Sequence, residues 1–333
     1  MTGATGFLGR AIVESLVASG RPVRALVRSD SAAQRVTVLG AEPVRGDLRD
    51  QSGLEAAFAG CDVVYHAAGV NSFCLPDPRP MFEVNVAGSR AVVLAAAAAG
   101  VARVVYTSSA ATLDAAPERG SARRFLSNYA RSKYEAERAA MDAASSTEVA
   151  LVCVNPASVQ GPGRTSGTAR LLIGFLNGKL PAAVNGPLNV IDIADCTRGH
   201  LLAEERGVPG ERYLLCGASM TLRSGLALLS TLTGLEDPPR FLPPSLALAA
   251  ATCLEAVARL RRKPTRFCRE MVRTLIEGSP YDGSQATRDL GLVYTPIETT
   301  MRRTISWYIE QGLILRPLPG FTEPPAPAGR PSA

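Results

Sequence analysis

Apolar residues in the first 160 positions follow two alternating spacings. Ile12, Leu16 and Val17 share one face of a helix that Gly20 ends, and the same spacing predicts helices over residues 82–99 and 129–144. Short apolar runs, which predict buried strands, occupy residues 23–27, 61–66, 101–107 and 148–154. Strands that alternate with helices form parallel sheets covered on both faces. The pattern therefore predicts an α/β fold with a doubly wound parallel sheet.

This alternation ends after Pro156, where a stretch rich in Gly and Pro begins. Helices beyond that point are no longer separated by regular strands, which predicts a second and smaller domain. The predicted division gives a first domain of residues 1–160 completed by 186–206, and a second domain of residues 161–185 and 207–315.

The composition is that of a globular protein and argues against nucleic acid and membrane as partners. Of its 333 residues, 46% are apolar and 20% charged, which excludes disorder and coiled coil. The net charge of +6 comes from Arg spread along the whole chain, so we expect no nucleic-acid partner. The longest apolar run, residues 246–254, is too short to span a membrane, and no signal peptide opens the chain. These features predict a cytoplasmic protein without a transmembrane segment.

Cysteine usage argues against a disulfide framework and against a metal site. The seven Cys are odd in number and contain no C-x-x-C pair, and the chain has two His. We therefore expect a reducing compartment and no bound metal.

Three glycines open the chain at a spacing that suits a phosphate ligand. In T-G-A-T-G-F-L-G, Gly3, Gly6 and Gly9 precede a helix, with Phe7 and Leu8 between them. Such glycines allow a tight turn and bring a pyrophosphate close to the helix N-terminus. The motifs Gly46-Asp47-Leu48 and His66-Ala67-Ala68-Gly69 follow strand-like segments, at the strand ends where an open α/β sheet binds its ligand. The sequence thus predicts a dinucleotide site on a Rossmann-type sheet.

A second motif carries acid–base chemistry. Tyr129 and Lys133 are four residues apart on a predicted helix and share one face. An ammonium beside a phenol favours the phenolate, so we expect Lys133 to lower the pKa of Tyr129. Ser108 and Ser109 end the strand V-V-Y-T-S-S, and either hydroxyl could hold a substrate oxygen.

Together these motifs resemble the extended short-chain dehydrogenase/reductase superfamily, of the NAD-dependent epimerase/dehydratase type. The resemblance runs from residue 2 to about 315. Segments 175–182 and 188–217 are most similar to dihydroflavonol-reductase-like proteins and to hopanoid-associated sugar epimerases. Segments 242–246 and 281–291 also resemble bacterial 3β-hydroxysteroid-dehydrogenase-like proteins.

The resemblance implies a role for each matching residue. Tyr129 is implied as general acid/base, Lys133 as the residue that tunes it and binds the nicotinamide ribose, and Ser109 as the residue that binds the reacting oxygen. The cofactor contacts implied in addition to the glycine turn are Asp47, Leu48, Ala67, Ala68, Gly69, Asn85, Thr107 and Pro156. Arg28, at the end of the second strand, matches a phosphate-binding arginine, and its fork suits the 2′-phosphate of NADP. We therefore expect NADP to be preferred over NAD.

Several functions remain open at this point. The first is an NAD(P)-dependent oxidoreductase acting on a carbonyl or alcohol of a small, fairly apolar substrate. The alternatives are a nucleotide-sugar epimerase or dehydratase with tightly held NAD, a 3β-hydroxysteroid-dehydrogenase-like enzyme, and a non-catalytic dinucleotide sensor. A homodimer is also open.

Three segments depart from a simple domain of this type. The family's first strand, which precedes the glycine turn, is absent, so we expect a gap in the sheet and a natural chain that begins upstream of Met1. The apolar segment 245–263 is expected to line the second domain's core, with docking at a membrane surface as the alternative. Residues 316–333 contain six Pro in eighteen and are expected to form a disordered tail.

Overall fold

A computed structural model describes residues 1–115, 125–236, 238–261, 265 and 267–322. Its main sheet is parallel, with the strand order β3-β4-β5-β9. These strands are β3 (Val63–His66), β4 (Arg103–Thr107), β5 (Ala150–Pro156) and β9 (Arg212–Leu215). A separate parallel pair is formed by β1 (Arg24–Val27) and β2 (Glu42–Arg45).

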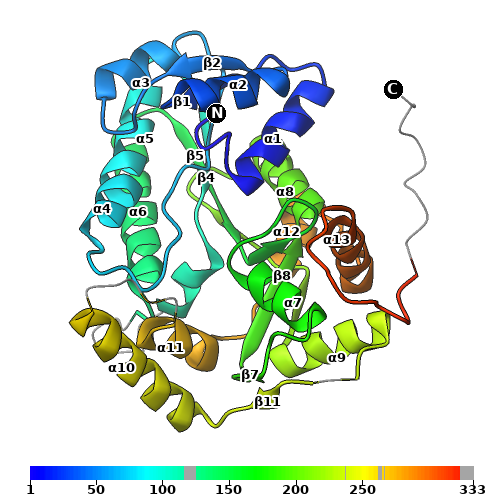
Figure 1. Ribbon diagram of the computed structural model, residues 1–333. Helices are drawn as coiled ribbons and strands as arrows, with labels where there is room; N and C mark the ends of the chain where they lie inside the picture. Colours follow the sequence, from blue (N-terminus) through cyan, green and yellow to red (C-terminus); the bar gives the residue numbers. More distant parts are fainter. Residues whose placement is uncertain (116–124, 237, 262–264, 266, 323–333) are drawn as a thin grey trace.

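Helices cover both faces of this sheet, as Figure 1 shows. One face carries α1 (Phe7–Ala18) and α8 (Ile193–Arg206), which contact each other. The other face carries α3 (Gln51–Phe58), α5 (Gly88–Ala98) and α6 (Asn128–Ser145). The helix α2 (Asp30–Val38) connects β1 to β2. The doubly wound α/β fold predicted from the hydrophobic pattern is thus confirmed.

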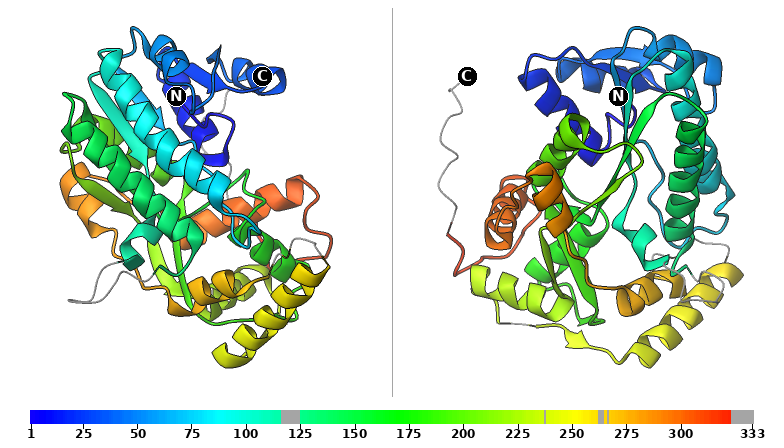
Figure 2. Two further views of the ribbon diagram at one scale, coloured as in Figure 1. Left: turned by 90° about the vertical axis from the view of Figure 1, so that its left-hand side faces the viewer. Right: turned by 180° about the vertical axis from the view of Figure 1, so that it is seen from behind.

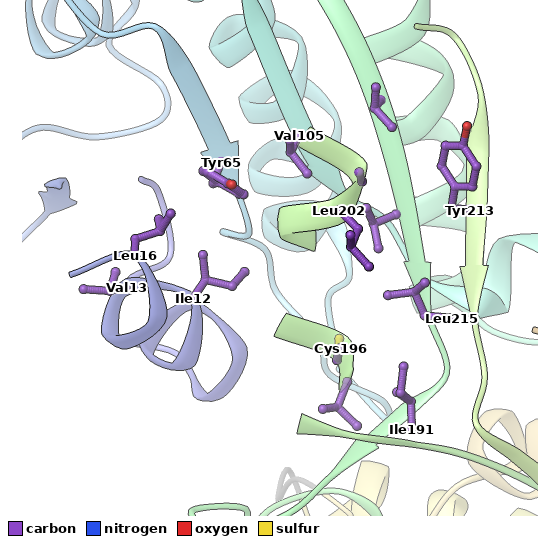
Figure 3. Packing of buried hydrophobic residues seen from close by; sticks show 14 of the residues in the cluster. Ile12, Val13, Leu16, Tyr65, Val105, Ile191, Cys196, Leu202, Tyr213 and Leu215 are labelled. Carbon is purple, nitrogen blue, oxygen red and sulfur yellow. The ribbon is translucent and has the colours of Figure 1, made fainter. Parts of the chain in front are cut away.

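Side chains alternate between the two faces along each central strand. Val105 and Val152 pack with α1 and α8 in one cluster (Figure 3), whereas Val104 and Leu151 belong to a cluster on the opposite face. Both neighbours in each pair are fully or almost fully buried, which is typical of a parallel sheet covered on both sides.

The expected gap in the sheet lies between β1 and β3. Of the residues that the structure describes, Met1 and Thr2 occupy this position: the amide of Leu26 donates to Met1 O (2.9 Å), and the amide of Thr2 donates to Tyr65 O (2.9 Å). Thr2 forms a single parallel bridge with His66. A small cavity of about 10 Å³ lies beside them, lined by residues of β1, β2, α3 and β3. The two parts of the sheet are therefore joined through two residues.

The rest of the chain forms a second group of elements below the main sheet in Figure 1. Its strands are β6 (Ser158–Gln160), β7 (Ala182–Ala183), β8 (Pro187–Asp192), β10 (Ala218–Thr221) and β11 (Arg240–Phe241). Its helices are α7 (Thr168–Leu176), α9 (Leu222–Thr233), α10 (Pro244–Leu260), α11 (Arg269–Glu277) and α13 (Ile297–Glu310), whereas α12 (Ser284–Leu290) packs on α8 and β9 of the main sheet. Strand β8 pairs antiparallel with β10 and parallel with β6, while β7 pairs with β11.

Two expectations about this part hold only in part. One face of helix α10 lines the core through Ala247 and Ala251, as expected, whereas Leu254 is 50% and Leu260 86% exposed. The helix lies at the edge of the molecule in both views of Figure 2. Residues 316–322 do not form a free tail, because Leu318 and Phe321 pack on a hydrophobic cluster built from α7, α9 and α13. Residues 323–333 lie outside the described residues.

One helical stretch, Arg79–Ala98, is long and apolar enough to cross a membrane by length and composition alone. It comprises α4 (Arg79–Phe82), a π-helical turn η1 (Glu83–Ala87) and α5. Because it packs against α3 and α6 and contributes buried residues to the sheet's hydrophobic cluster, it is a core helix.

Candidate active site

The glycine turn fits tightly against the end of β3. Gly3 has φ +74°, and a Cβ built on it would lie 2.6 Å from the backbone of Ala67 and Ala68. A Cβ on Gly9 would lie 2.1 Å from Gly3 O. Helix α1 begins after Gly6 without a side-chain cap, so its first N–H groups face the turn. Glycine is therefore required at these two positions for the turn to pack on β3 and on α1, and the uncapped N–H groups at the start of α1 suit a pyrophosphate.

Residues expected at the adenosine end lie at the carboxyl ends of β1 and β2. Arg28 directly follows β1 and is exposed. The Asp47 carboxylate accepts from Arg49 Nε (2.9 Å), and this bond, with a smaller attraction to Arg28, lowers the pKa of Asp47 to about 2. Leu48 packs where a side chain on Gly88 of α5 would stand. The structure thus places Arg28 and Asp47 close enough to interact electrostatically.

At the other end of the site, Tyr129 stands in the first turn of α6. Ser127 caps this helix by accepting from the amide of Ala130 (3.0 Å). Burial raises the pKa of the Tyr129 phenol, while a hydrogen bond with the Ser109 side chain and the charge of Arg164 lower it. Tyr129 and Ser109 are therefore brought together, as the motif predicts.

Lys133 lies one turn further along α6 and is buried. Its Nζ donates to Thr107 O (2.9 Å) and to the hydroxyl of Tyr106 (3.1 Å). Burial lowers the pKa of Lys133 to about 8, against the opposing charge of Glu137.

The expectation that Lys133 lowers the pKa of Tyr129 is not met. Its ammonium is directed to the end of β4, and the groups that lower the pKa of the phenol are Ser109 and Arg164. Tyr106, which the motif search missed, is the side chain that Lys133 contacts, and its ring lies 4.8 Å from Nζ.

Asn85 ties the loop after β3 to the helix that carries Tyr129. Its Oδ1 accepts from the amide of Val70 (2.7 Å), and its Nδ2 donates to Val70 O and to Ser132 Oγ (3.0 Å each). Gly69, beside Val70, is close to both Asn85 and Lys133 Nζ. Asn85 stands in the π-helical turn η1, a geometry often found at functional sites. Asn85 therefore holds the loop after β3 in place against α6.

Asn155 is a second positioning residue, which the sequence patterns did not single out. Its Nδ2 donates to Glu137 (2.7 Å), to Thr112 Oγ1 (3.0 Å) and to Ser109 O (3.3 Å). A fully buried amide in an otherwise apolar strand was the available signal, because such a group needs partners. Pro156 follows it at the end of β5. The neighbouring Ser108 hydroxyl is buried without a partner, which leaves a polar group at the site for a ligand.

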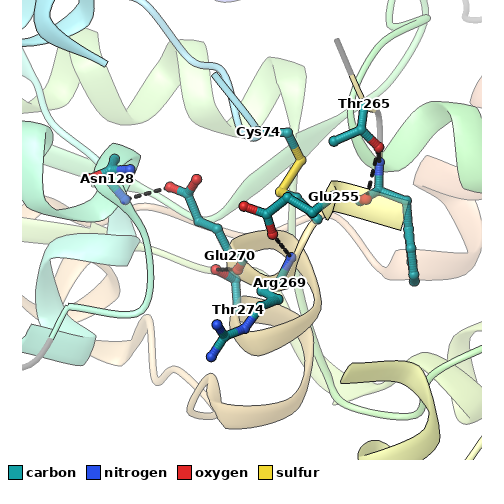
Figure 4. Close-up of a disulfide and its surroundings, with 9 residues drawn as sticks. Cys74, Asn128, Glu255, Thr265, Arg269, Glu270 and Thr274 are labelled. Carbon is teal, nitrogen blue, oxygen red and sulfur yellow. Dashed lines mark hydrogen bonds between the residues drawn. A yellow bond between two sulfur atoms is a disulfide. The ribbon is translucent and has the colours of Figure 1, made fainter. Parts of the chain in front are cut away.

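The expectation from the cysteine pattern that disulfides are absent was wrong for one pair, whose disulfide is drawn in Figure 4. It links Cys74, in the loop after β3, to Cys268 at the start of α11. Phe73 in the same loop contacts the Tyr129 ring, with centroids 5.7 Å apart. Glu270 of α11 accepts a hydrogen bond from the amide of Asn128, next to Tyr129. Pairing across 194 positions leaves no local spacing to detect, and five other cysteines are free.

Within the described residues, no group of three or more His, Cys, Asp or Glu could hold a metal ion. The site therefore offers a glycine turn, a row of strand ends, and a half-buried Ser–Tyr pair with a Lys one helical turn away. This arrangement is that of a dinucleotide-dependent enzyme.

Comparison with known proteins identifies the family. The chain belongs to the NAD dependent epimerase/dehydratase family, whose model matches residues 1–216. It is 33% identical to "Sterol demethylase protein B" of Methylococcus capsulatus over 94% of this chain and 99% of that protein. It is 34% identical to a Synechocystis sp. protein provisionally named dihydroflavonol 4-reductase, over 94% of this chain and 95% of that one.

A solved structure has the same fold over nearly the full length. The crystal structure of gox2253 superposes with a TM-score of 0.79 at 30% identity, covering 94% of this chain and 98% of the other. The resemblance stated from the motifs is thereby confirmed, and the chain is an NAD(P)-dependent enzyme of the extended short-chain dehydrogenase/reductase type.

Proposed function

We propose that this protein is a reductase that transfers hydride from NADPH to the carbonyl group of a small, fairly apolar substrate. The observation that carries the proposal is the placement of Ser109 close enough to the Tyr129 phenol to act on it, beside the loop that packs on the glycine turn. When bound, the dinucleotide supplies the hydride at its nicotinamide ring.

The protein's own residues would orient the substrate and supply the proton. Ser109 holds the reacting oxygen, and Asn155 fixes its backbone from behind. Tyr129 gives its phenolic proton to that oxygen, and its raised pKa keeps the proton in place before the reaction at neutral pH. Lys133 stands at the end of β4, where the ribose hydroxyls would be held.

The cofactor residues fit a dinucleotide along one edge of the sheet. The pyrophosphate would be contacted by the glycine turn, that is by Gly3, Gly6, Phe7, Leu8 and Gly9. The segment Ala67, Ala68 and Gly69 would face it from the end of β3. Asp47 and Leu48 would contact the adenine, while Asn85, Thr107 and Pro156 would border the ribose and nicotinamide. Arg28 would bind the 2′-phosphate, so NADP is favoured over NAD.

Relatives named as reductases, such as cinnamoyl-CoA reductase 1 of Petunia hybrida at 30% identity, support carbonyl reduction.

Tyr129→Phe tests the acid–base assignment. We expect kcat to fall at least about 100-fold, because this role contributes typically 10²–10⁴-fold, while the Kd for NADPH stays within about twofold. Tyr134→Phe, on the same helix, is the matched control and should keep full activity. If Tyr129→Phe kept more than about a tenth of kcat, the assignment would be wrong.

The second candidate is an epimerase, which the same triad supports and which the family name includes. The two functions differ in cofactor stoichiometry. A reductase oxidises one NADPH for each product molecule, whereas an epimerase returns the hydride to its substrate and shows no net oxidation of the cofactor. Native mass spectrometry of the purified protein adds a second test, since an epimerase would retain NAD. If the purified protein retained NAD and showed no net oxidation of NADPH, the epimerase assignment would replace the reductase assignment.

A further inference from the structure

Arg164 lies in the glycine-rich segment 161–167 between β6 and α7, and no motif singled it out. Gly161, Gly163 and Gly167 all have positive φ, which side chains other than glycine rarely adopt. Arg164 Nε donates to Ser166 O at 3.1 Å, which fixes one edge of its guanidinium. The loop therefore presents a single cation in a defined orientation.

That cation lies between the two halves of the site. Its guanidinium carbon is 5.3 Å from the centroid of the Phe7 ring, the first residue of α1 after the glycine turn. A Cβ on Gly163 would lie 3.4 Å from the same ring, so the loop packs directly on it. On its other side, Arg164 is close enough to Tyr129 and Tyr308 to act on both electrostatically.

The charge of Arg164 is half-buried and lacks a counter-ion. No carboxylate pairs with it among the described residues, whereas the partly buried Arg212 and Arg303 reach Glu137 (3.1 Å) and Asp192 (2.5 Å). Its aromatic neighbours do not supply a negative charge, because burial keeps both phenols protonated at neutral pH. The Tyr308 hydroxyl is itself buried without a hydrogen-bond partner.

A partly desolvated guanidinium without a carboxylate is costly unless a ligand neutralises it. We infer that Arg164 binds an anionic oxygen group, a phosphate or a carboxylate, of the molecule held between Phe7 and Tyr129. Its planar fork suits two oxygens of such a group. The group has two sources: the pyrophosphate of the dinucleotide, or an acidic group on the substrate. The second source rests on the proposed function, and the first does not.

The test is a binding measurement that needs no turnover. Arg164→Gln removes the charge, Arg164→Lys keeps it without the fork, and Arg170→Gln changes an exposed arginine of α7 as the matched control. Calorimetry gives the Kd of each protein for NADPH. It then gives the Kd of the NADPH-loaded protein for benzoate and for its neutral analogue benzamide. Thermal melting checks that each variant is folded.

We expect Arg164→Gln to weaken one anion by about 10- to 150-fold, as for a lost charge-assisted hydrogen bond. Arg164→Lys should fall between that variant and the unchanged protein. If Arg164→Gln loses affinity for NADPH, Arg164 binds the pyrophosphate of the dinucleotide. If it loses affinity for benzoate but not for benzamide, Arg164 binds a carboxylate of the substrate. The inference would be overturned if the Kd values of Arg164→Gln for NADPH and for benzoate both stayed within twofold of those of the unchanged protein. It would also be overturned if Arg164→Gln left the Kd for NADPH unchanged and the unchanged, NADPH-loaded protein did not bind benzoate. Because binding is measured directly, neither result depends on whether the enzyme is a reductase or an epimerase.

Discussion

Breaking the Cys74–Cys268 disulfide should destabilise the protein by several kcal/mol. The bond closes a loop across 194 positions. In the chain-entropy treatment, such a loop removes about 18 cal/mol/K from the unfolded state, or roughly 5 kcal/mol at 25 °C. With about 2.1 cal/mol/K of unfolding entropy per residue, this corresponds to a fall in Tm of about 7 °C.

The assay compares thermal unfolding with and without dithiothreitol. The oxidised protein and the Cys253→Ser control, which removes an exposed free thiol, should melt together and should both lose about 7 °C on reduction. Cys74→Ser should melt at the reduced value and should not respond to dithiothreitol. Thiol titration after unfolding without reductant should find five free thiols, and seven after reduction. Seven thiols before reduction, or a Tm that stays constant while the count rises from five to seven, would refute the reasoning.

Three further outcomes follow from the site and the sheet. Arg28→Ala should weaken NADPH by about 10- to 150-fold and leave NADH almost unchanged, because a charge-assisted contact to the 2′-phosphate is lost; equal losses in titrations of both cofactors would contradict the assignment. Burial lowers the pKa of His66 to about 3 and of His200 to about 4, below the value of about 6.5 in the unfolded chain, so the unfolded state takes up protons first as the pH falls. The contribution of the two histidines to the free energy of unfolding, from urea titrations, should therefore be complete above about pH 7 and smaller by about 4 kcal/mol at pH 5; a value that stays constant between pH 7 and pH 5 would show that the histidines are not held neutral. Five apolar β-forming residues added before Met1 should fill the space between β1 and β3 and raise the Tm, at roughly 1.5–3 kcal/mol per buried side chain, whereas a Gly/Ser extension of equal length should not; equal melting of the two would show that the gap costs nothing.

The sequence predicted those elements whose burial follows a regular period. Helix α6 is buried along one face and strands β4 and β5 along most of their length, and their boundaries were predicted to within about two residues. Strand β2 was expected only as a strand-like segment ahead of Gly46, without bounds, because its residues, E-P-V-R, are largely exposed and show no regular burial period. Helix α10 has the composition of a core helix, yet alanines face inward, because tertiary packing and not composition selects the buried face.

At the site, spacing predicted the pairs that share one element or adjoining strand ends. Tyr129 and Lys133 are on one helix, and Ser109 ends a neighbouring strand, so local rules sufficed to place them. Arg164 was not found, because its position depends on how a glycine-rich loop folds over Phe7. Nor could local rules direct the Lys133 ammonium to Tyr106 rather than to Tyr129.

The split sheet has a consequence for how this protein moves. Strands β1 and β2 with α2 lie at the end of the sheet proposed for the adenosine, and among the described residues Met1 and Thr2 join them by backbone hydrogen bonds to β3. Amide exchange in β1 and β2 should therefore report local opening at a smaller free energy than global unfolding, while β4 and β5 exchange with the whole domain. A dinucleotide that contacts both parts of the sheet would hold them together. Its binding would then slow amide exchange in β1 and β2, although these strands do not contact the reacting atoms.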